Sequence, residues 1–156
     1  MKKFLFDCGS RDVTASTGIL ALRLMIGLMM LVGHGIPKIQ AFSQMKDNFP
    51  APDFFPLKYM SPPVALVSAI GGEVVAAALI ILGLATRPAA FVLGFTMVVA
   101  AFDVHGSAPW FMGPGVAAAK EPALLYLIPM IAIILSGAGA YSLDAGLYKE
   151  GKRRRW

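Results

Sequence analysis

The feature that most constrains this chain is an apolar run over residues 63–85 that carries a single acid, Glu73, near its middle. A run of this length can cross a bilayer as one helix, because about 20 apolar residues span the hydrocarbon layer. A carboxylate at that depth is costly in lipid, and such groups usually face a partner or a wet cavity. The run therefore predicts a transmembrane helix whose acid faces inward. The acid serves either a functional site or a buried pair that only holds the helices together.

The composition of the 156 residues is that of a membrane protein. Hydrophobic residues make up 57% of the chain and charged residues only 15%, whereas about 25% of an ordinary soluble domain is charged. The length indicates a single domain. The net charge of +5 comes mainly from the two tails, where basic residues next to a span touch anionic lipid, so we predict no nucleic-acid binding. The single cysteine, Cys8, excludes a dithiol relay within the chain.

The hydrophobic pattern predicts an all-α polytopic membrane protein, an antiparallel bundle of four transmembrane helices. A cytoplasmic N-terminal arm over residues 1–16 precedes the membrane domain of residues 17–140, and a basic cytoplasmic tail over 141–156 follows it. Pro88 suits the first position of the third helix, and Pro129 predicts a kink in the fourth. The predicted spans are residues 17–36, 63–85, 88–105 and 121–140.

Lysine and arginine predict how the bundle lies in the cell (inner) membrane. One side carries only four lysines: Lys38, Lys46, Lys58 and Lys120. The other side carries the larger basic set: Lys2, Lys3, Arg11, Arg87, Lys149, Lys152, Arg153, Arg154 and Arg155. Because cytoplasmic loops hold the excess of basic residues, we expect both termini in the cytoplasm. The two connections rich in proline and aromatic residues, 37–61 and 106–119, are then expected outside.

Polar side chains follow one stripe of the first predicted span. At about 100° per residue, Arg23, His34 and Lys38 fall on the same helix face. Lipid would not tolerate that stripe, so it is expected to face Glu73, with Arg23 approaching from the inner side and His34 from the outer side. A neutral imidazole near a carboxylate suits proton transfer. The candidate catalytic residues are therefore Glu73, His34 and Arg23.

Further ionisable residues gather in the outer half of the predicted bundle. The same residues also suit structural ion pairs or interfacial side chains that reach water, and both interpretations stay open. The chain has two histidines, far apart in the sequence, and no cysteine pair. A metal site would have to combine both histidines with Glu73, and we predict none. The candidate ligand-binding residues are Lys38, Asp103, His105, Lys120 and Glu121.

Short motifs occur in a fixed order over about residues 19–147. They are Arg23-Leu-Met-Ile-Gly27, Gly33-His34-Gly35 with Lys38, Gly72-Glu73, Gly83-Leu-Ala-Thr-Arg87 with Ala89-Ala90, Lys120-Glu121-Pro-Ala-Leu-Leu, and Gly137-Ala-Gly-Ala-Tyr-Ser-Leu-Asp144. In their order and spacing these motifs resemble the DoxX family of small four-span membrane proteins. Tyr141 departs from the family pattern, in which an arginine more usually precedes the final Ser-Leu-Asp.

The resemblance implies redox work at the membrane without implying a mechanism for any residue. The family takes its name from a subunit linked to thiosulfate oxidation with quinone as the electron acceptor, and other members are implicated in membrane redox-stress assemblies. The first hypothesis is therefore a quinone-linked, redox-associated membrane component. A quinone would enter from the lipid, Glu73 and His34 would exchange protons with its oxygens, and Arg23 would tune the carboxylate.

No haem, flavin or iron–sulfur ligand set is evident, so we expect no cofactor within the chain and electrons from a partner or a substrate. The alternative hypothesis is a non-enzymatic subunit or scaffold that docks a partner protein through the outer loops. Four aromatic residues among the prolines of residues 37–61 motivate it: Phe49, Phe54, Phe55 and Tyr59. Besides the lipid bilayer, the expected partners are thus a protein or further copies of this chain. A small-molecule or proton carrier is a third alternative.

Overall fold

A computed structural model describes residues 7–147, and every regular element among them is a helix. Three continuous helices are long and apolar enough to cross a membrane: Val13–Gln40, Pro62–Leu82 and Thr86–Val104. A fourth apolar helix, α8 (Glu121–Ser136), has 16 residues. The chain is therefore an all-helical membrane protein over the residues described. The N-terminal residues 1–6 and most of the basic C-terminal tail lie outside this description.

Each of the three long helices changes its winding along its length. The first consists of α2 (Val13–Met30), a π-helical turn η1 (Leu31–Gly35) and α3 (Ile36–Gln40). The second consists of α5 (Pro62–Ile70), the π-helical turn η3 (Gly71–Ala76) and α6 (Ala77–Leu82). The third consists of α7 (Thr86–Val99) and the π-helical turn η4 (Ala100–Val104).

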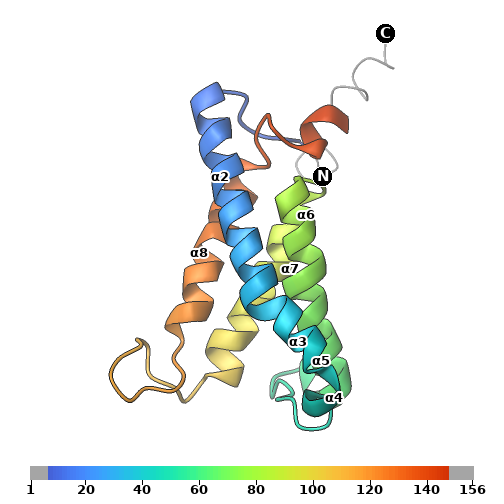
Figure 1. The fold of residues 1–156 in the computed structure, drawn as a ribbon, viewed down its shortest axis with the longest axis vertical. Coiled ribbons are helices and arrows are strands. Elements are labelled where there is room, and N and C mark those ends of the chain that lie inside the picture. Colours follow the sequence, from blue (N-terminus) through green and yellow to red (C-terminus); the bar gives the residue numbers. More distant parts are fainter. Residues whose placement is uncertain (1–6, 148–156) are drawn as a thin grey trace.

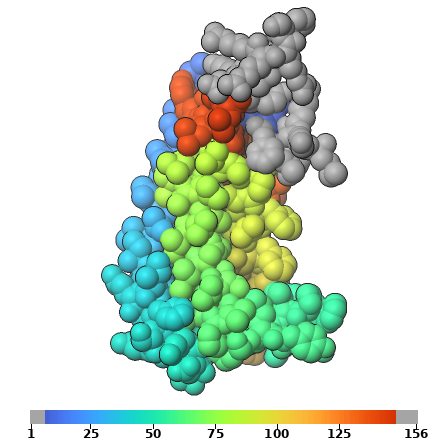
Figure 2. All heavy atoms as spheres, turned by 90° about the vertical axis from the view of Figure 1, so that its right-hand side faces the viewer, coloured from blue at the N-terminus to red at the C-terminus, as the bar shows by residue number. Residues whose placement is uncertain are grey.

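Figure 1 shows the helices side by side, with α2 crossing in front of α7 and the chain reversing direction between successive helices. The turn between α6 and α7 lies near the start of α2 and the end of α8, and we call this the turn end. The opposite end holds α4 (Phe42–Met45), the 3₁₀ turn η2 (Leu57–Tyr59) and residues 105–120, and we call it the loop end. Figure 2 shows the segment before α5 projecting beyond the α5–α6 column at the loop end.

The helix bounds differ from the expected spans for local reasons. The first helix begins at Val13 because the Asp12 side chain accepts a hydrogen bond from the Ala15 amide and caps it. It continues to Gln40, so the expected outer connection 37–61 starts with helix. The last helix ends at Ser136, before the expected residue 140, because Gly137 leaves the helical region with φ +83° and ψ −166°, a backbone conformation that glycine adopts readily.

Small residues bring the helices into close contact around a buried core. Gly27 lies against the Ala77 carbonyl and Ile81, and Gly94 lies against Met130. In membrane helices small residues allow backbones to approach, because lipid supplies little hydrophobic drive for packing. The core cluster contains Met30, Ala76, Ala77, Ile80, Ala89, Ala90, Leu93, Met97, Ala101, Ala123, Tyr126, Met130 and Ile133.

Buried polar groups hold the turn end together. The Asp144 carboxylate accepts hydrogen bonds from the amides of Ala85 and Thr86 at 2.8 and 2.9 Å, and from the Thr86 hydroxyl at 2.8 Å. Ala85 is the N-cap residue of α7 and Thr86 its first residue, and the Ala85 side chain supplies no cap. The segment after α8 therefore caps the start of α7 from a distance in sequence.

Gly35 provides a test of the close contact between η1 and η3. A Cβ added at Gly35 would lie 2.6 Å from Val74 Cγ2 and 3.1 Å from the Glu73 carbonyl oxygen, whereas one added at Gly33 would meet nothing within 4 Å. We expect Gly35→Ala to lower the free energy of unfolding by about 1–3 kcal/mol through overpacking. Gly33→Ala should leave it unchanged or slightly raised. Thermal unfolding of both purified variants in the same detergent measures the difference, and equal melting temperatures would contradict the packing described.

Candidate functional site

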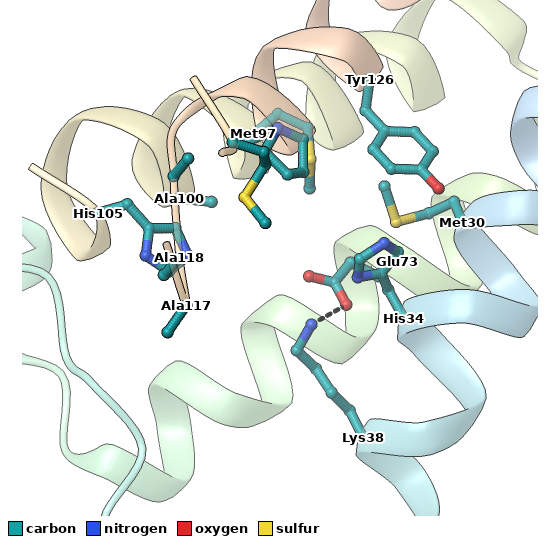
Figure 3. A pocket seen from close by; sticks show the side chains of 14 residues that line it. Met30, His34, Lys38, Glu73, Met97, Ala100, His105, Ala117, Ala118 and Tyr126 are labelled. Atoms are coloured by element: carbon teal, nitrogen blue, oxygen red, sulfur yellow. Dashed lines mark hydrogen bonds and ion pairs between the residues drawn. The ribbon is translucent and has the colours of Figure 1, made fainter. Parts of the chain in front are cut away.

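A cavity of about 300 Å³ lies at the loop end, between the helices and the connection that precedes α8. This volume is at the lower end of the range for small-molecule pockets in proteins. Figure 3 shows polar side chains on two sides of it and thioether and aromatic groups between them. Its lining residues are Met30, His34, Lys38, Glu73, Met97, Ala100, His105, Met112, Ala117, Ala118, Ala119, Pro122, Ala123 and Tyr126.

An ion pair between Lys38 and Glu73 forms one wall of the cavity. The Lys38 ammonium, from α3, donates a hydrogen bond to Glu73 Oε2, from η3. The glutamate side chain is 7% exposed and the lysine side chain 20% exposed. The acid that interrupts the apolar run is thus compensated by a cation from the first helix, and the pair remains on the cavity surface.

The three π-helical turns all reach the cavity. His34 lies in η1, Glu73 in η3 and Ala100 in η4. The wider winding is visible in the backbone bonds, since the Ile36 amide reaches the Leu31 carbonyl and the His105 amide reaches the Ala100 carbonyl. Single π turns inside α-helices occur frequently at functional sites. Their coincidence at one level of this fold marks the cavity as the candidate site.

Both histidines of the chain line the cavity. The His34 ring meets the Tyr126 ring edge-on, with centroids 5.4 Å apart. In Figure 3 His105 lies across the cavity from Glu73 and Lys38. Within residues 7–147, no protein group makes a hydrogen bond to either imidazole, so their ring nitrogens are available to a ligand or to water.

Three of the predicted ligand-binding residues organise the loops instead of lining the cavity. Asp103 accepts hydrogen bonds from the Asp53 amide at 3.0 and 3.2 Å. Lys120 lies over the Trp110 ring, 4.9 Å from its centroid. Glu121 accepts a hydrogen bond from the Met112 amide at 2.7 Å and so holds the connection that covers the cavity. Lys38 and His105 do line the cavity.

Arg23 lies away from the cavity, which differs from the expected approach to Glu73. Its guanidinium, on a residue 1% exposed, donates to the carbonyls of Ala138 and Tyr141 at the turn end. It touches the helix end at Gly83, ten residues from Glu73 and therefore about 15 Å along that helix. Arg23 thus faces the inside of the bundle as expected, but it contacts the backbone that follows α8 instead of Glu73.

Several residues that line the cavity were not among the candidate site residues predicted from the sequence: Met30, Met97, Met112 and Tyr126. Met30 precedes His34 by one helical turn, which is the one signal that could have indicated it. In the part of the chain that the structure describes, no group of three or more His, Cys, Asp or Glu side chains lies close enough to hold a metal ion.

Comparisons with known proteins relate the chain to one family and to two further proteins. The profile of the DoxX family matches residues 18–106, which include the Lys38–Glu73 pair and His105. An uncharacterized protein of Haemophilus influenzae is 34% identical over 131 residues, covering 83% of this chain and 90% of that protein. A second uncharacterized protein of the same organism is 26% identical over 153 residues, covering 96% of each chain. No solved structure matches the chain significantly.

The Lys38–Glu73 pair predicts an asymmetric response to neutralisation. Lys38→Gln leaves a carboxylate that is 7% exposed without its partner, whereas Glu73→Gln leaves a longer, more exposed lysine that can reach water. Breaking a buried pair costs roughly 3–5 kcal/mol, and we expect Lys38→Gln to approach this loss and Glu73→Gln to lose less. Melting temperatures of the two variants and of the double variant measure the coupling. Additive losses would contradict a direct pair.

Proposed function

The chain belongs to the DoxX family, and from this premise we propose that its cavity binds a quinone and exchanges protons with it. The observation that carries the proposal is the Lys38–Glu73 pair facing a cavity that both histidines also line. Reduction of a quinone consumes two electrons and two protons, so a quinone site needs acids or bases within reach of the quinone oxygens. Glu73 and His34 are the groups proposed for this role, as one wall of the cavity carries both.

The proposed topology is an antiparallel four-span bundle in the inner membrane. At about 1.5 Å per residue, α8 is about 24 Å long, and a span somewhat shorter than the hydrocarbon layer is accommodated by local thinning. Arg87 lies at the turn end and the basic tail follows it in the sequence, so the positive-inside rule puts both termini in the cytoplasm. The cavity then opens in the outer half of the membrane.

The rest of the cavity suits an aromatic ring with polar oxygens. Thioether and alanine side chains form its apolar surface, and the Tyr126 ring stands beside His34. The Lys38 ammonium offers a donor to a quinone oxygen, and Glu73 is positioned to pass a proton once a ligand draws Lys38 away. Arg23 takes no part, because it binds backbone carbonyls at the opposite end. Electrons come from a partner protein or a substrate.

Glu73→Gln tests this role directly. We expect the variant to fold but to bind a short-chain ubiquinone at least about tenfold more weakly, about 1.4 kcal/mol, because Glu73 is the only carboxylate among the described residues that line the cavity. Binding is measured as quenching of tryptophan emission in purified protein reconstituted in lipid nanodiscs. Glu121→Gln is the matched control, since Glu121 holds the Met112 amide without lining the cavity. Equal affinities in the wild-type protein and both variants would overturn the assignment.

Exposed aromatic residues at the loop end favour a second function, docking of a partner protein through the outer loops. Phe55 and Tyr59 are 73% and 75% exposed, and Phe111 in the other connection is 74% exposed. Such residues serve either as membrane-interface anchors or as contacts for a partner. In this proposal the four helices act as a scaffold and the cavity is secondary.

A double variant separates docking from anchoring. Phe54→Ala with Phe55→Ala should remove any specific partner from complexes purified after gentle solubilisation, while the amount of protein in the membrane stays unchanged. Phe91→Ala with Phe95→Ala, on the exposed face of α7, is the matched control for loss of lipid contact. Partner sets that are identical in the wild-type protein and both variants would contradict docking through this loop.

A further inference from the structure

The cavity concentrates one type of chemistry that the quinone proposal does not use. The chain has two histidines and nine methionines, and both histidines and three methionines line this one cavity. The donors are His34, His105, Met30, Met97 and Met112. Thioether sulfur is a soft ligand and imidazole nitrogen a borderline one, and together they favour Cu(I) over hard divalent cations.

We propose that the cavity is a binding site for Cu(I), held by methionine thioethers and histidine imidazoles. The inference uses the same cavity as the quinone proposal, but it assigns the thioethers the role of ligands instead of an apolar surface and gives no role to Glu73 or Lys38. Its substrate class is a soft monovalent cation. No electron transfer is part of it.

The arrangement of the donors supports a shared site. Figure 3 draws Met30 on the side of the cavity that holds His34 and Tyr126, His105 on the other side and Met97 between the two sides. Met30 comes from α2 and His34 from the adjoining η1, one helical turn apart. Met112 comes from the connection that precedes α8, and its amide donates a hydrogen bond to Glu121. The donors therefore approach from separate elements around one space, as the ligands of a metal site do.

Core packing explains why these methionines are buried, but it does not explain why both histidines line the same cavity. Met30 and Met97 are 1% and 4% exposed and belong to the hydrophobic core. An unbranched thioether is one of several side chains that fill such positions. What core packing does not require is that the same cavity also hold every imidazole of the chain, with no protein hydrogen bond to either ring within residues 7–147.

The charges of the cavity favour a monovalent ion. Mg²⁺ and Ca²⁺ take carboxylate, carbonyl and water oxygens. Among the cavity-lining residues in 7–147, Glu73 is the one carboxylate, and it is already engaged by Lys38. Neutral thioethers and imidazoles leave the charge of a bound ion uncompensated, and that penalty is smaller for one positive charge than for two. Cu(I) meets both conditions.

The test is anaerobic competition for Cu(I) between the purified protein and bathocuproine disulfonate. Full-length protein with a tag free of histidine is reconstituted in nanodiscs, and Cys8→Ala is the background, since a thiol is itself a copper ligand. We expect one Cu(I) per chain. X-ray absorption at the copper edge should show both sulfur and imidazole scattering.

Neighbouring methionines supply a matched pair of variants. Met30→Leu conserves volume and should weaken Cu(I) binding at least tenfold. Met29→Leu, at a residue 58% exposed on the outer face of the same helix, should leave it unchanged. His105→Ala should weaken binding as Met30→Leu does. Copper uptake no greater than that of empty nanodiscs, or equal affinity in all three variants, would overturn the proposal.

The outcome is independent of the quinone assignment. Glu73→Gln removes the proposed proton carrier but no copper ligand, so it should lose quinone binding and keep Cu(I) binding. Met30→Leu keeps an apolar side chain of similar volume in the cavity wall, so it should weaken Cu(I) binding at least tenfold and weaken ubiquinone binding much less. Loss of Cu(I) binding in the Glu73→Gln variant would contradict the ligand set proposed here.

Discussion

A carboxylate in the middle of an apolar helix must find a compensating charge, and the contact between Lys38 and Glu73 is the interaction on which the rest of this structure depends. It joins the first long helix to the second and lets the chain keep an acid where lipid would otherwise reject it. The lysine provides the charge through a long stem that starts nearer the loop end. Because the two charges compensate each other, the cavity beside them can keep its imidazoles unengaged.

The two ends of the fold use their buried polar groups differently. At the turn end, Arg23 binds carbonyls just after α8, and Asp144 binds the first amides of α7. Each charge thus lies at the helix terminus whose dipole it complements. Both side chains form hydrogen bonds with backbone groups and do not line the cavity. At the loop end, Glu73, His34 and His105 face an open volume instead. The polar side chains that line the cavity therefore lie at the opposite end of the molecule from the buried charges Arg23 and Asp144.

Much of the helical order followed from the apolar runs, because long uninterrupted hydrophobic stretches have few alternatives to helix. The inward direction of Glu73 and Arg23 was also predictable, since lipid excludes both charges. Their partners were not. Arg23 bonds with backbone 115 and 118 positions away, and backbone carbonyls have no sequence signature. The role of Glu121 depended on a loop path that periodicity does not describe. The methionines were missed because a thioether in a core resembles any other apolar side chain.

The π-helical turns also explain why a regular helical wheel fails beyond His34. A turn closed by a bond to the fifth residue back holds one residue more than an α-helical turn, so every later side chain is rotated by about 100° from its regular position. Met30 and Lys38 thus belong to two registers of one helix, offset by a single residue. The π turn therefore absorbs one residue without changing which way the ammonium points relative to Met30. Deleting one residue from residues 31–35 would leave a regular α-helix with the side chains on both sides in their present directions, whereas rewinding the same residues as α-helix would turn the ammonium by about 100° away from the cavity. Relatives that lack one residue at this point would therefore keep the same pairing of the acid.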